Sequence, residues 1–452
     1  MIRINHKNVV YRKYDDFGVI YNLETKSIIT LQEVALDIFD FAFMSNRELK
    51  IEDISKHISE LYEVEYDLVF EDVVEFINSL ICERYIIDDN TKIDTDVVNT
   101  VPKNEYRDLE GEIIAILQKR NQLFSATIEL TYLCNEKCIH CYATYCDKTQ
   151  PKRELDVDKC KRIIDELKEM KCCHINFTGG DPFVFKGFDE VFKYAREQNF
   201  VCCIYTNGQA MYFDKKIADK IIEYVPRTIY ISLYGATAEV HDSITQVKGS
   251  FERTIAIAKK LIENKVSVVF QMMILTINYR HVNDMIALAE TLGADYRVGL
   301  SIINKNNGDS SPQQYAVSDI ETVKEIISIS KTKFISMDKE SAVQKTDLKS
   351  SICGAGTSSV CISPDGNVYP CVSLKIKIGN IFSKSLKAIW NSKERKDVLD
   401  SLIWEKAEKC PDCKYVDYCP HCVGISHLEN GRMLSCNNCD FLLAKASYEI
   451  NN

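Results

Sequence analysis

The chain has 452 residues, of which 46% are hydrophobic and 27% are charged, and its formal net charge is −10. These proportions are typical of a globular protein with two or three domains, and the negative charge argues against nucleic acid as a partner. No apolar run is long enough to cross a membrane and the N-terminus lacks a signal-peptide pattern, so we expect a cytoplasmic protein with no membrane partner.

Nineteen cysteines are distributed unevenly along the chain. A disulfide framework is not expected, because the cytoplasm keeps thiols reduced. Three cysteines form one compact motif and nine more lie between Cys353 and Cys439, a distribution that indicates metal or cluster binding. The other seven are expected to be core thiols without an assigned function: Cys82, Cys146, Cys160, Cys172, Cys173, Cys202 and Cys203.

Residues 1–90 begin with three strand patterns, at 8–13, 17–22 and 27–30. Three helical patterns follow, at 31–43, 51–62 and 66–81. This order predicts a winged-helix-like α+β domain. The usual function of a winged helix is DNA binding, but this segment holds 9 basic residues against 19 acidic ones. Such a surface repels phosphates.

A polar linker is predicted at 91–122, with one short helix at 111–119. The segment 123–304 then alternates strands with amphipathic helices, a pattern that predicts an α/β domain with a parallel sheet and crossover helices. The expected strands are 126–132, 173–178, 201–206, 228–234, 266–273 and 295–301, and two of the helices are 157–170 and 251–264. Residues 305–349 form a bridging segment with a helix at 317–329.

Cys134, Cys138 and Cys141 directly follow the first of these strands, at positions i, i+4 and i+7. A loop of this length can place three thiolates on one face of a cluster or metal, and it leaves a further position open, as catalytic sites do. A zinc knuckle is the alternative interpretation.

Further motifs follow the next strands, at the strand ends where barrel enzymes carry their active sites. The second strand leads into Thr178–Gly179–Gly180–Asp181–Pro182, in which the glycines allow close backbone approach and the carboxylate can bind an ammonium group. The third leads into Thr206–Asn207–Gly208, and the fourth into Ser232–Leu233–Tyr234–Gly235.

Residues 350–452 contain the remaining cysteine cluster and a hairpin pattern at Pro364–Asp365–Gly366. Two structural zinc sites with four cysteines each are one interpretation of such spacings. The candidate ligands are Cys353, Cys361, Cys371, Cys410, Cys413, Cys419, Cys422, Cys436 and Cys439.

The Cys-x3-Cys-x2-Cys loop, with His140 before its last thiol and Tyr142 after it, resembles the signature of the radical S-adenosylmethionine (SAM) enzymes. The resemblance implies a partial (β/α)6 barrel and a 4Fe–4S cluster whose open iron is chelated by SAM, the source of a 5′-deoxyadenosyl radical. Asp181 replaces the glutamate that is usual in the glycine motif. The implied SAM-binding residues are His140, Tyr142, Gly179, Gly180, Asp181, Pro182, Thr206, Asn207 and Ser232.

The C-terminal cysteines resemble a SPASM domain, which implies two auxiliary 4Fe–4S clusters and therefore three clusters in all. Cys353, Cys371 and Cys422 would hold the inner auxiliary cluster, while Cys410, Cys413, Cys419 and Cys436 would hold the outer one. Cys361 is a candidate fourth inner ligand, or that position is open to substrate. Cys439 is the alternative to Cys436. The two residues between Cys419 and Cys422 depart from the three of the family pattern.

Residues 1–90 resemble the leader recognition element of peptide-modifying enzymes, whose prototype is the PqqD peptide chaperone. A leader would add a strand beside residues 27–30 and contact the helix at 66–81. The whole pattern resembles maturases of ribosomally made precursor peptides that install cysteine thioether crosslinks, with a reductant such as flavodoxin or ferredoxin. The alternatives are enzymes that make C–C crosslinks or epimers, a formylglycine-forming sulfatase maturase, and a non-enzymatic iron–sulfur or zinc regulator. No catalytic acid or base can be named.

Overall fold

A computed structural model of the chain describes residues 1–88, 108–143, 154–330, 349, 351–407 and 409–452. The chain divides into two compact units. One unit comprises Met1–Arg120 with Asn199–Val201, and the other comprises Asn121–Gln198 with Cys202–Asn452. Most of the predicted linker (91–107), part of the bridging segment (331–348) and Cys146 lie outside the described residues.

The first unit contains the three strands and three helices predicted from the sequence. Its elements are β1 (Ile2–Ile4), β2 (Val9–Lys13), β3 (Gly18–Asn22), β4 (Ile28–Leu31), α1 (Glu33–Ser45), α2 (Ile51–Tyr62), α3 (Tyr66–Cys82), β5 (Ile86–Asp88) and α4 (Leu109–Lys119). The pairing of β1 with β5, which are 82 residues apart at their closest, was not predicted. Cys82 is exposed, so the prediction that it is a core thiol is wrong.

Strands β2, β3 and β4 form an antiparallel sheet in that order, so within the described sheet β4 is paired on one side, with β3. Apolar side chains from the sheet and all three helices form one core, including Ile20, Phe39, Ile54 and Ile77, each at most 1% exposed. Packing against the helices thus fixes the position of β3. Strand β4, which pairs with β3, is the outer strand of this three-stranded sheet.

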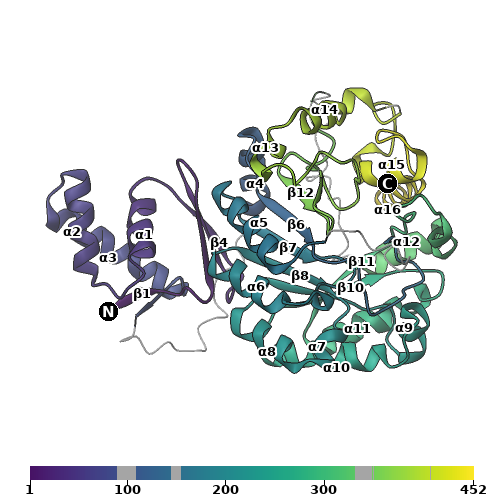
Figure 1. The fold of residues 1–452 in the computed structure, drawn as a ribbon, viewed down its shortest axis with the longest axis horizontal. Helices are drawn as coiled ribbons and strands as arrows, with labels where there is room; N and C mark the ends of the chain where they lie inside the picture. Colours follow the sequence, from purple (N-terminus) through teal and green to yellow (C-terminus); the bar gives the residue numbers. More distant parts are fainter. Residues whose placement is uncertain (89–107, 144–153, 331–348, 350, 408) are drawn as a thin grey trace. The chain divides into compact units, whose positions relative to one another are not determined.

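The second unit is built on six successive strands of one sheet, with helices in the connections (Figure 1). The strands are β6 (Ser125–Glu129), β7 (His174–Thr178), β8 (Val201–Thr206), β9 (Thr228–Ser232), β10 (Val268–Met273) and β11 (Asp295–Gly299). The connecting elements are α5 (Val157–Glu169), α6 (Phe188–Glu197), α7 (Gln209–Phe213), α8 (Lys215–Tyr224), α9 (Ala238–Thr245), α10 (Ser250–Glu263) and α11 (Val282–Leu292), with short 3₁₀ turns at Pro182–Val184 and Tyr279–His281. The predicted α/β architecture with a parallel sheet is confirmed.

Burial of both faces explains the apolar composition of these strands. Phe177 on β7 and Ile204 on β8 are fully buried, and so are their neighbours Cys173 and Cys202. Because the strands run in one direction, their carboxyl ends lie at one edge of the sheet. The cysteine loop after β6 and the glycine motif after β7 therefore meet there. Five predicted core thiols are indeed buried: Cys160, Cys172, Cys173, Cys202 and Cys203.

The C-terminal cysteine-rich segment extends the same sheet. Strand β12 (Ser359–Ile362) pairs in parallel with β6, and the predicted hairpin is formed by β12 and β13 (Asn367–Tyr369). The remaining elements are α12 (Ile320–Ile329), β14 (Gly379–Asn380), α13 (Leu386–Trp390), α14 (Lys393–Ser401), α15 (Val423–Asn430) and α16 (Asn438–Asn451), with 3₁₀ turns at Ser311–Tyr315, Trp404–Lys406 and Val416–Tyr418. None of the described helices is long and apolar enough to cross a membrane.

Candidate active site

The cysteine loop is held by backbone hydrogen bonds on two sides. On one side, the N–H groups of Lys137 and Ile139 donate to the carbonyl oxygens of Thr245 and Ile244, at 3.0 and 3.1 Å. These carbonyls belong to the last turn of α9, where helix carbonyls lack partners within the helix. The loop therefore provides hydrogen-bond donors for the last carbonyl groups of α9, and these bonds hold the loop in position.

On the other side, the loop packs against the glycine motif after β7. The N–H groups of Gly180 and Asp181 donate to the carbonyl oxygens of Thr131 and Leu133, at 2.8 and 2.9 Å. A Cβ atom on Gly180 would lie 2.1 Å from the Leu133 carbonyl oxygen, closer than any contact permits. Glycine is required here so that the backbones of the two loops can touch. The sequence predicted a close approach to a ligand at this motif, whereas at Gly180 the structure shows a close approach to the backbone of the cysteine loop.

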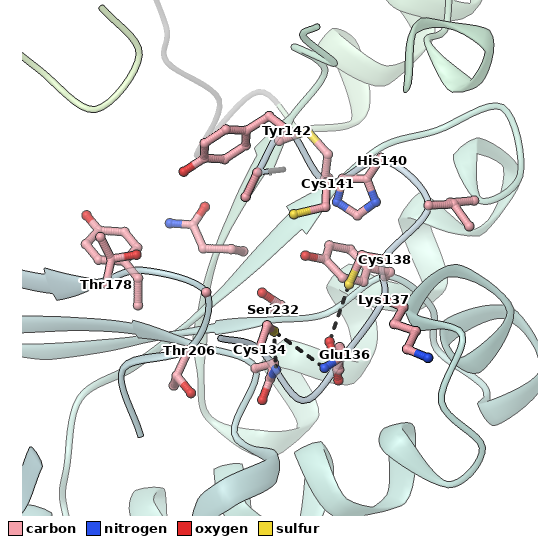
Figure 2. A pocket seen from close by; sticks show the side chains of 18 of the residues that line it. Cys134, Glu136, Lys137, Cys138, His140, Cys141, Tyr142, Thr178, Thr206 and Ser232 are labelled. Carbon is pink, nitrogen blue, oxygen red and sulfur yellow. Dashed lines mark hydrogen bonds between the residues drawn. The ribbon is translucent and has the colours of Figure 1, made fainter. Parts of the chain in front are cut away.

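A cavity of about 670 Å³ opens at this edge of the sheet, a size that suits a cofactor-sized ligand. Figure 2 shows the sulfur atoms of Cys134, Cys138 and Cys141 around one space in it. Most of the predicted SAM-binding residues also line the cavity: His140, Tyr142, Gly179, Gly180, Thr206, Asn207 and Ser232.

Asp181 and Pro182 do not line the cavity. Asp181 is fully buried, and its carboxylate accepts hydrogen bonds from the Thr206 hydroxyl (2.7 Å) and from the backbone N–H groups of Asn207 (2.9 Å) and Phe183 (3.0 Å). The short side chain turns inward, because three donors of its own chain surround it, and its contact with SAM stays a prediction.

Protein atoms around the thiols disfavour their ionised forms. Although the surface of Cys134 is open to the cavity, desolvation raises its pKa to about 12, and the nearby Asp181 adds to the shift. Burial likewise raises the pKa of Cys138 well above its usual value. The thiols of Cys134 and Cys138 are thus protonated at neutral pH, and ligation of a cluster must release those protons.

Two polar atoms of the loop lack partners. Oε1 of Glu136 and Nδ1 of His140 are buried, and neither has a hydrogen-bond partner among the described residues. Burial raises the pKa of Glu136 to about 8 and lowers that of His140 to about 4. Buried polar atoms without partners are costly, and both residues line the cavity. Three thiols in the cavity, together with two buried polar atoms of lining residues that lack partners, fit a polar, sulfur-ligated cofactor.

Aromatic packing supports the cavity wall beside α9. The rings of His140 and Tyr234 meet edge to face, with centroids 4.7 Å apart. The backbone N–H of Tyr234 donates to Nδ1 of His241 (3.2 Å), and burial lowers the His241 pKa to about 4. His241 is therefore neutral at physiological pH, as this acceptor role requires.

Sequence reasoning missed the loop after β11. Lys305, Asn307 and Asp309 line the cavity, and Lys305 forms an ion pair with Asp309 at 2.7 Å. The N–H of Asn306 donates to the carbonyl oxygen of Tyr142 (2.9 Å), which joins this loop to the cysteine loop. The sequence signal for this loop was its position after a predicted strand, but the loop carries no recognisable motif.

The C-terminal thiols influence one another electrostatically in two groups. The first consists of Cys353, Cys371 and Cys422, which also influence Cys361 and Cys439, and the second consists of Cys410, Cys413, Cys419 and Cys436. Burial raises the pKa of Cys353, and Cys422 adds to that shift. Burial also raises the pKa of Cys371, with a smaller contribution from Cys353. In the second group, burial raises the pKa of Cys410 to about 11, with Cys436 and Cys413 contributing. Burial also raises the pKa of Cys419 to about 12, with Cys410 and Cys436 among its neighbours.

Cys439 lies apart from that second group. Burial raises its pKa to about 12, and the residues that add to the shift are Asp440, Glu429 and Cys422. The Asp440 carboxylate accepts the backbone N–H of Cys422 at 2.5 Å. The choice between Cys436 and Cys439 as the fourth ligand stays a prediction.

Within the described residues, no group of three or more His, Cys, Asp or Glu side chains is arranged to hold a single metal ion.

Cys361 occupies a strand between the two halves of this unit. It is fully buried on β12, where it is paired in register with Thr127 of β6 and Tyr369 of β13. Beside it, Lys375 and the buried Glu129 form a partly buried ion pair at 2.9 Å. Burial raises the Cys361 pKa, and Glu129 adds to the shift. Its role as a cluster ligand stays a prediction.

Comparison with known proteins agrees with this arrangement. Residues 128–289 match the family model described as "Radical SAM superfamily", and residues 353–422 match the one described as "Iron-sulfur cluster-binding domain" (SPASM). The mycofactocin maturase MftC of Mycolicibacterium smegmatis is 30% identical over 309 residues, which cover 65% of this chain and 76% of MftC. The chain belongs to the radical SAM superfamily.

Two further similarities are informative about this radical SAM protein. The antilisterial bacteriocin subtilosin biosynthesis protein AlbA of Bacillus subtilis is 28% identical over 314 residues, which cover 66% of each chain. The crystal structure of Streptococcus suis SuiB bound to precursor peptide SuiA covers 97% of this chain and 100% of SuiB, with a TM-score of 0.62 and 17% identity. At that identity the structural likeness establishes the fold alone.

The close contact at Gly180 predicts that Gly180→Ala lowers the free energy of unfolding by about 1–3 kcal/mol, as overpacking does. The new methyl group must displace the Leu133 carbonyl, so we also expect reconstituted protein to lose up to about four iron atoms per chain. Both quantities are measurable by chemical denaturation and by iron analysis.

The matched control is Gly299→Ala, also in the cavity wall, where the new Cβ would meet only the flexible end of Met273 at 3.4 Å. We expect it to retain iron like the unchanged chain. Full iron loading by Gly180→Ala would contradict the proposed packing constraint.

Proposed function

We propose that this protein is a maturase that uses SAM to install cysteine thioether crosslinks in a leader-bearing, ribosomally made precursor peptide. The observation that carries the proposal is the convergence of Cys134, Cys138 and Cys141 in one cavity, on a chain that also holds two groups of C-terminal cysteines. The peptide substrate is suggested by the relatives, a mycofactocin maturase and a bacteriocin biosynthesis protein.

In this proposal the three loop thiolates hold a 4Fe–4S cluster, and the cavity residues His140, Tyr142, Thr206 and Ser232 enclose SAM. When bound, the cofactors supply radical chemistry that removes hydrogen from an unactivated peptide carbon, as well as redox centres for the surplus electron. The chain's own contribution is to exclude water and to fix the loop. The fixed backbone hydrogen bonds of Lys137 and Ile139 serve that purpose.

The auxiliary cysteines are assigned in the same way. Cys353, Cys371 and Cys422 would hold the inner cluster, with its remaining position taken by Cys361 or by a substrate thiolate. The set for the outer cluster is Cys410, Cys413, Cys419 and Cys436. With the SAM-binding cluster, three clusters are proposed, and a flavodoxin or ferredoxin is the proposed electron donor.

Leader recognition is assigned to the first unit, as a PqqD-like element. Asn22 donates its backbone N–H to the carbonyl of Ser27 (2.9 Å), which makes these residues a hydrogen-bonded pair of the β3–β4 ladder. Because such pairs alternate in antiparallel sheets, the N–H groups of Ile28 and Thr30 point away from β3. An extended leader can pair with these groups.

The proposal is tested by co-expression with a short, cysteine-rich peptide encoded beside this gene. We expect the peptide to lose two hydrogen atoms per crosslink, and the participating cysteine to resist alkylation by iodoacetamide, because its sulfur is bonded to carbon. High-resolution mass spectrometry of the alkylated peptide measures both effects.

The same experiment separates the alternatives. A C–C crosslink gives the same loss of hydrogen but leaves every thiol open to alkylation, whereas epimerisation leaves the mass unchanged. Formylglycine formation removes the sulfur of the modified cysteine. Each of these results would contradict thioether formation, and an unmodified peptide with an active, SAM-cleaving enzyme would contradict the choice of substrate.

The ladder geometry predicts that Thr30→Pro weakens leader binding about tenfold or more, since proline removes an outward-facing N–H and tenfold corresponds to about 1.4 kcal/mol. Thr30 is exposed, and its N–H is not used by β3. Fluorescence anisotropy with a labelled leader peptide measures the dissociation constant.

The control is Thr30→Val, which keeps the N–H and has a strong preference for strands. We expect it to bind the leader like the unchanged protein. Equal affinity of the proline and valine variants would exclude strand addition at β4.

A further inference from the structure

The side chain of Asn207 is directed at a cluster thiol. Asn207 follows β8 and is 7% exposed. Its Nδ2 group donates to Oδ1 of Asn135 at 2.7 Å and to the sulfur of Cys134 at 3.6 Å. Both protons of the amide are thereby used within the cysteine loop.

The orientation of this amide is fixed by its other atom. Oδ1 of Asn207 accepts the backbone N–H of Gln209 at 3.0 Å. If the amide were turned over, its NH2 group would face that N–H and its oxygen would face the oxygen of Asn135. The hydrogen-bond pattern therefore places the N–H donor toward Cys134.

Asp181 and Thr254 hold the Asn207 backbone from two sides. The Asp181 carboxylate accepts the Asn207 N–H at 2.9 Å and the Thr206 hydroxyl at 2.7 Å. The Thr254 hydroxyl donates to the Asn207 carbonyl at 3.0 Å. Asp181 and Thr254 are each fully buried, so water does not compete for these bonds.

We propose that Asn207 is a positioning residue of the SAM-binding cluster, whose amide donates an N–H···S bond to Cys134 and makes the cluster easier to reduce, and that Asp181 holds Asn207 in place. The inference rests on the proposed function for its cluster. Reduction adds negative charge to the cluster and its thiolates, so a donor to sulfur stabilises the reduced form more than the oxidised one. Hydrogen bonds to sulfur are among the determinants of cluster potentials.

The test is a redox titration of reconstituted full-length protein, followed by electron paramagnetic resonance. The signal of the SAM-binding cluster is recognised by its change when SAM is added. Asn207→Leu keeps a similar volume but lacks a donor. We expect its reduction equilibrium to be about tenfold less favourable, a downward shift of about 59 mV for a one-electron couple, with iron content unchanged.

The matched control is Asn264→Leu, which removes an exposed amide at the end of α10. We expect its potential to equal that of the unchanged protein. An unchanged potential in Asn207→Leu, with the cluster loaded, would overturn the inference.

Asp181→Asn tests the second part of the proposal, that Asp181 holds Asn207 in place. It also replaces Asn207→Leu as the test if that variant fails to retain iron. It leaves Asn207 in place but replaces two acceptor oxygens with one, so we expect a smaller shift in the same direction. A loaded Asp181→Asn cluster with unchanged potential but weakened SAM binding would instead make Asp181 a SAM ligand and overturn its positioning role. Failure of the unchanged chain to bind iron would contradict the proposed function itself, an outcome distinct from either result.

Discussion

The packing of the cysteine loop between two backbones is the constraint on which the rest of the site depends. The loop donates to the end of α9 through Lys137 and Ile139, and it accepts from Gly180 and Asp181 on its other side. None of these bonds uses a cysteine sulfur. The backbone of the loop, and with it the three cysteines, is therefore positioned by the sheet and helices.

The same constraint explains why the glycine motif contains two glycines and an inward-facing aspartate. A side chain at Gly180 would collide with the Leu133 carbonyl. Asp181 then turns beneath the loop and gathers the donors of Thr206, Asn207 and Phe183. This hydrogen-bond network therefore connects the glycine motif to the Asn207 amide, which donates to the sulfur of Cys134. The loops after three successive strands behave as one assembly.

Much of this fold could be predicted because its signals are local. Alternating strands and helices gave the parallel sheet, and the spacing of Cys134, Cys138 and Cys141 gave the site, since both are properties of neighbouring residues. The pairing of β12 with β6 could not be predicted in this way: more than 200 residues separate the strands, and no local pattern specifies a partner.

The direction of a short polar side chain could not be predicted from the sequence either. Asp181 can face a ligand or its own chain, and the decision depends on which donors the folded loops bring near it. The loop that carries Lys305 and Asp309 was missed for a related reason, because its place at the cavity is set by the packing of β11 and by the bond from Asn306 to Tyr142. Contacts that form only after folding are not marked by any spacing of residues in the sequence.

The most direct test of the account is anaerobic iron and sulfide analysis of the reconstituted chain, compared with a variant in which Cys134, Cys138 and Cys141 are all replaced by alanine. Three four-iron clusters predict about twelve iron atoms per chain, falling to about eight in the variant. Zinc in place of iron, or equal iron in the two proteins, would contradict a SAM-binding cluster in this cavity.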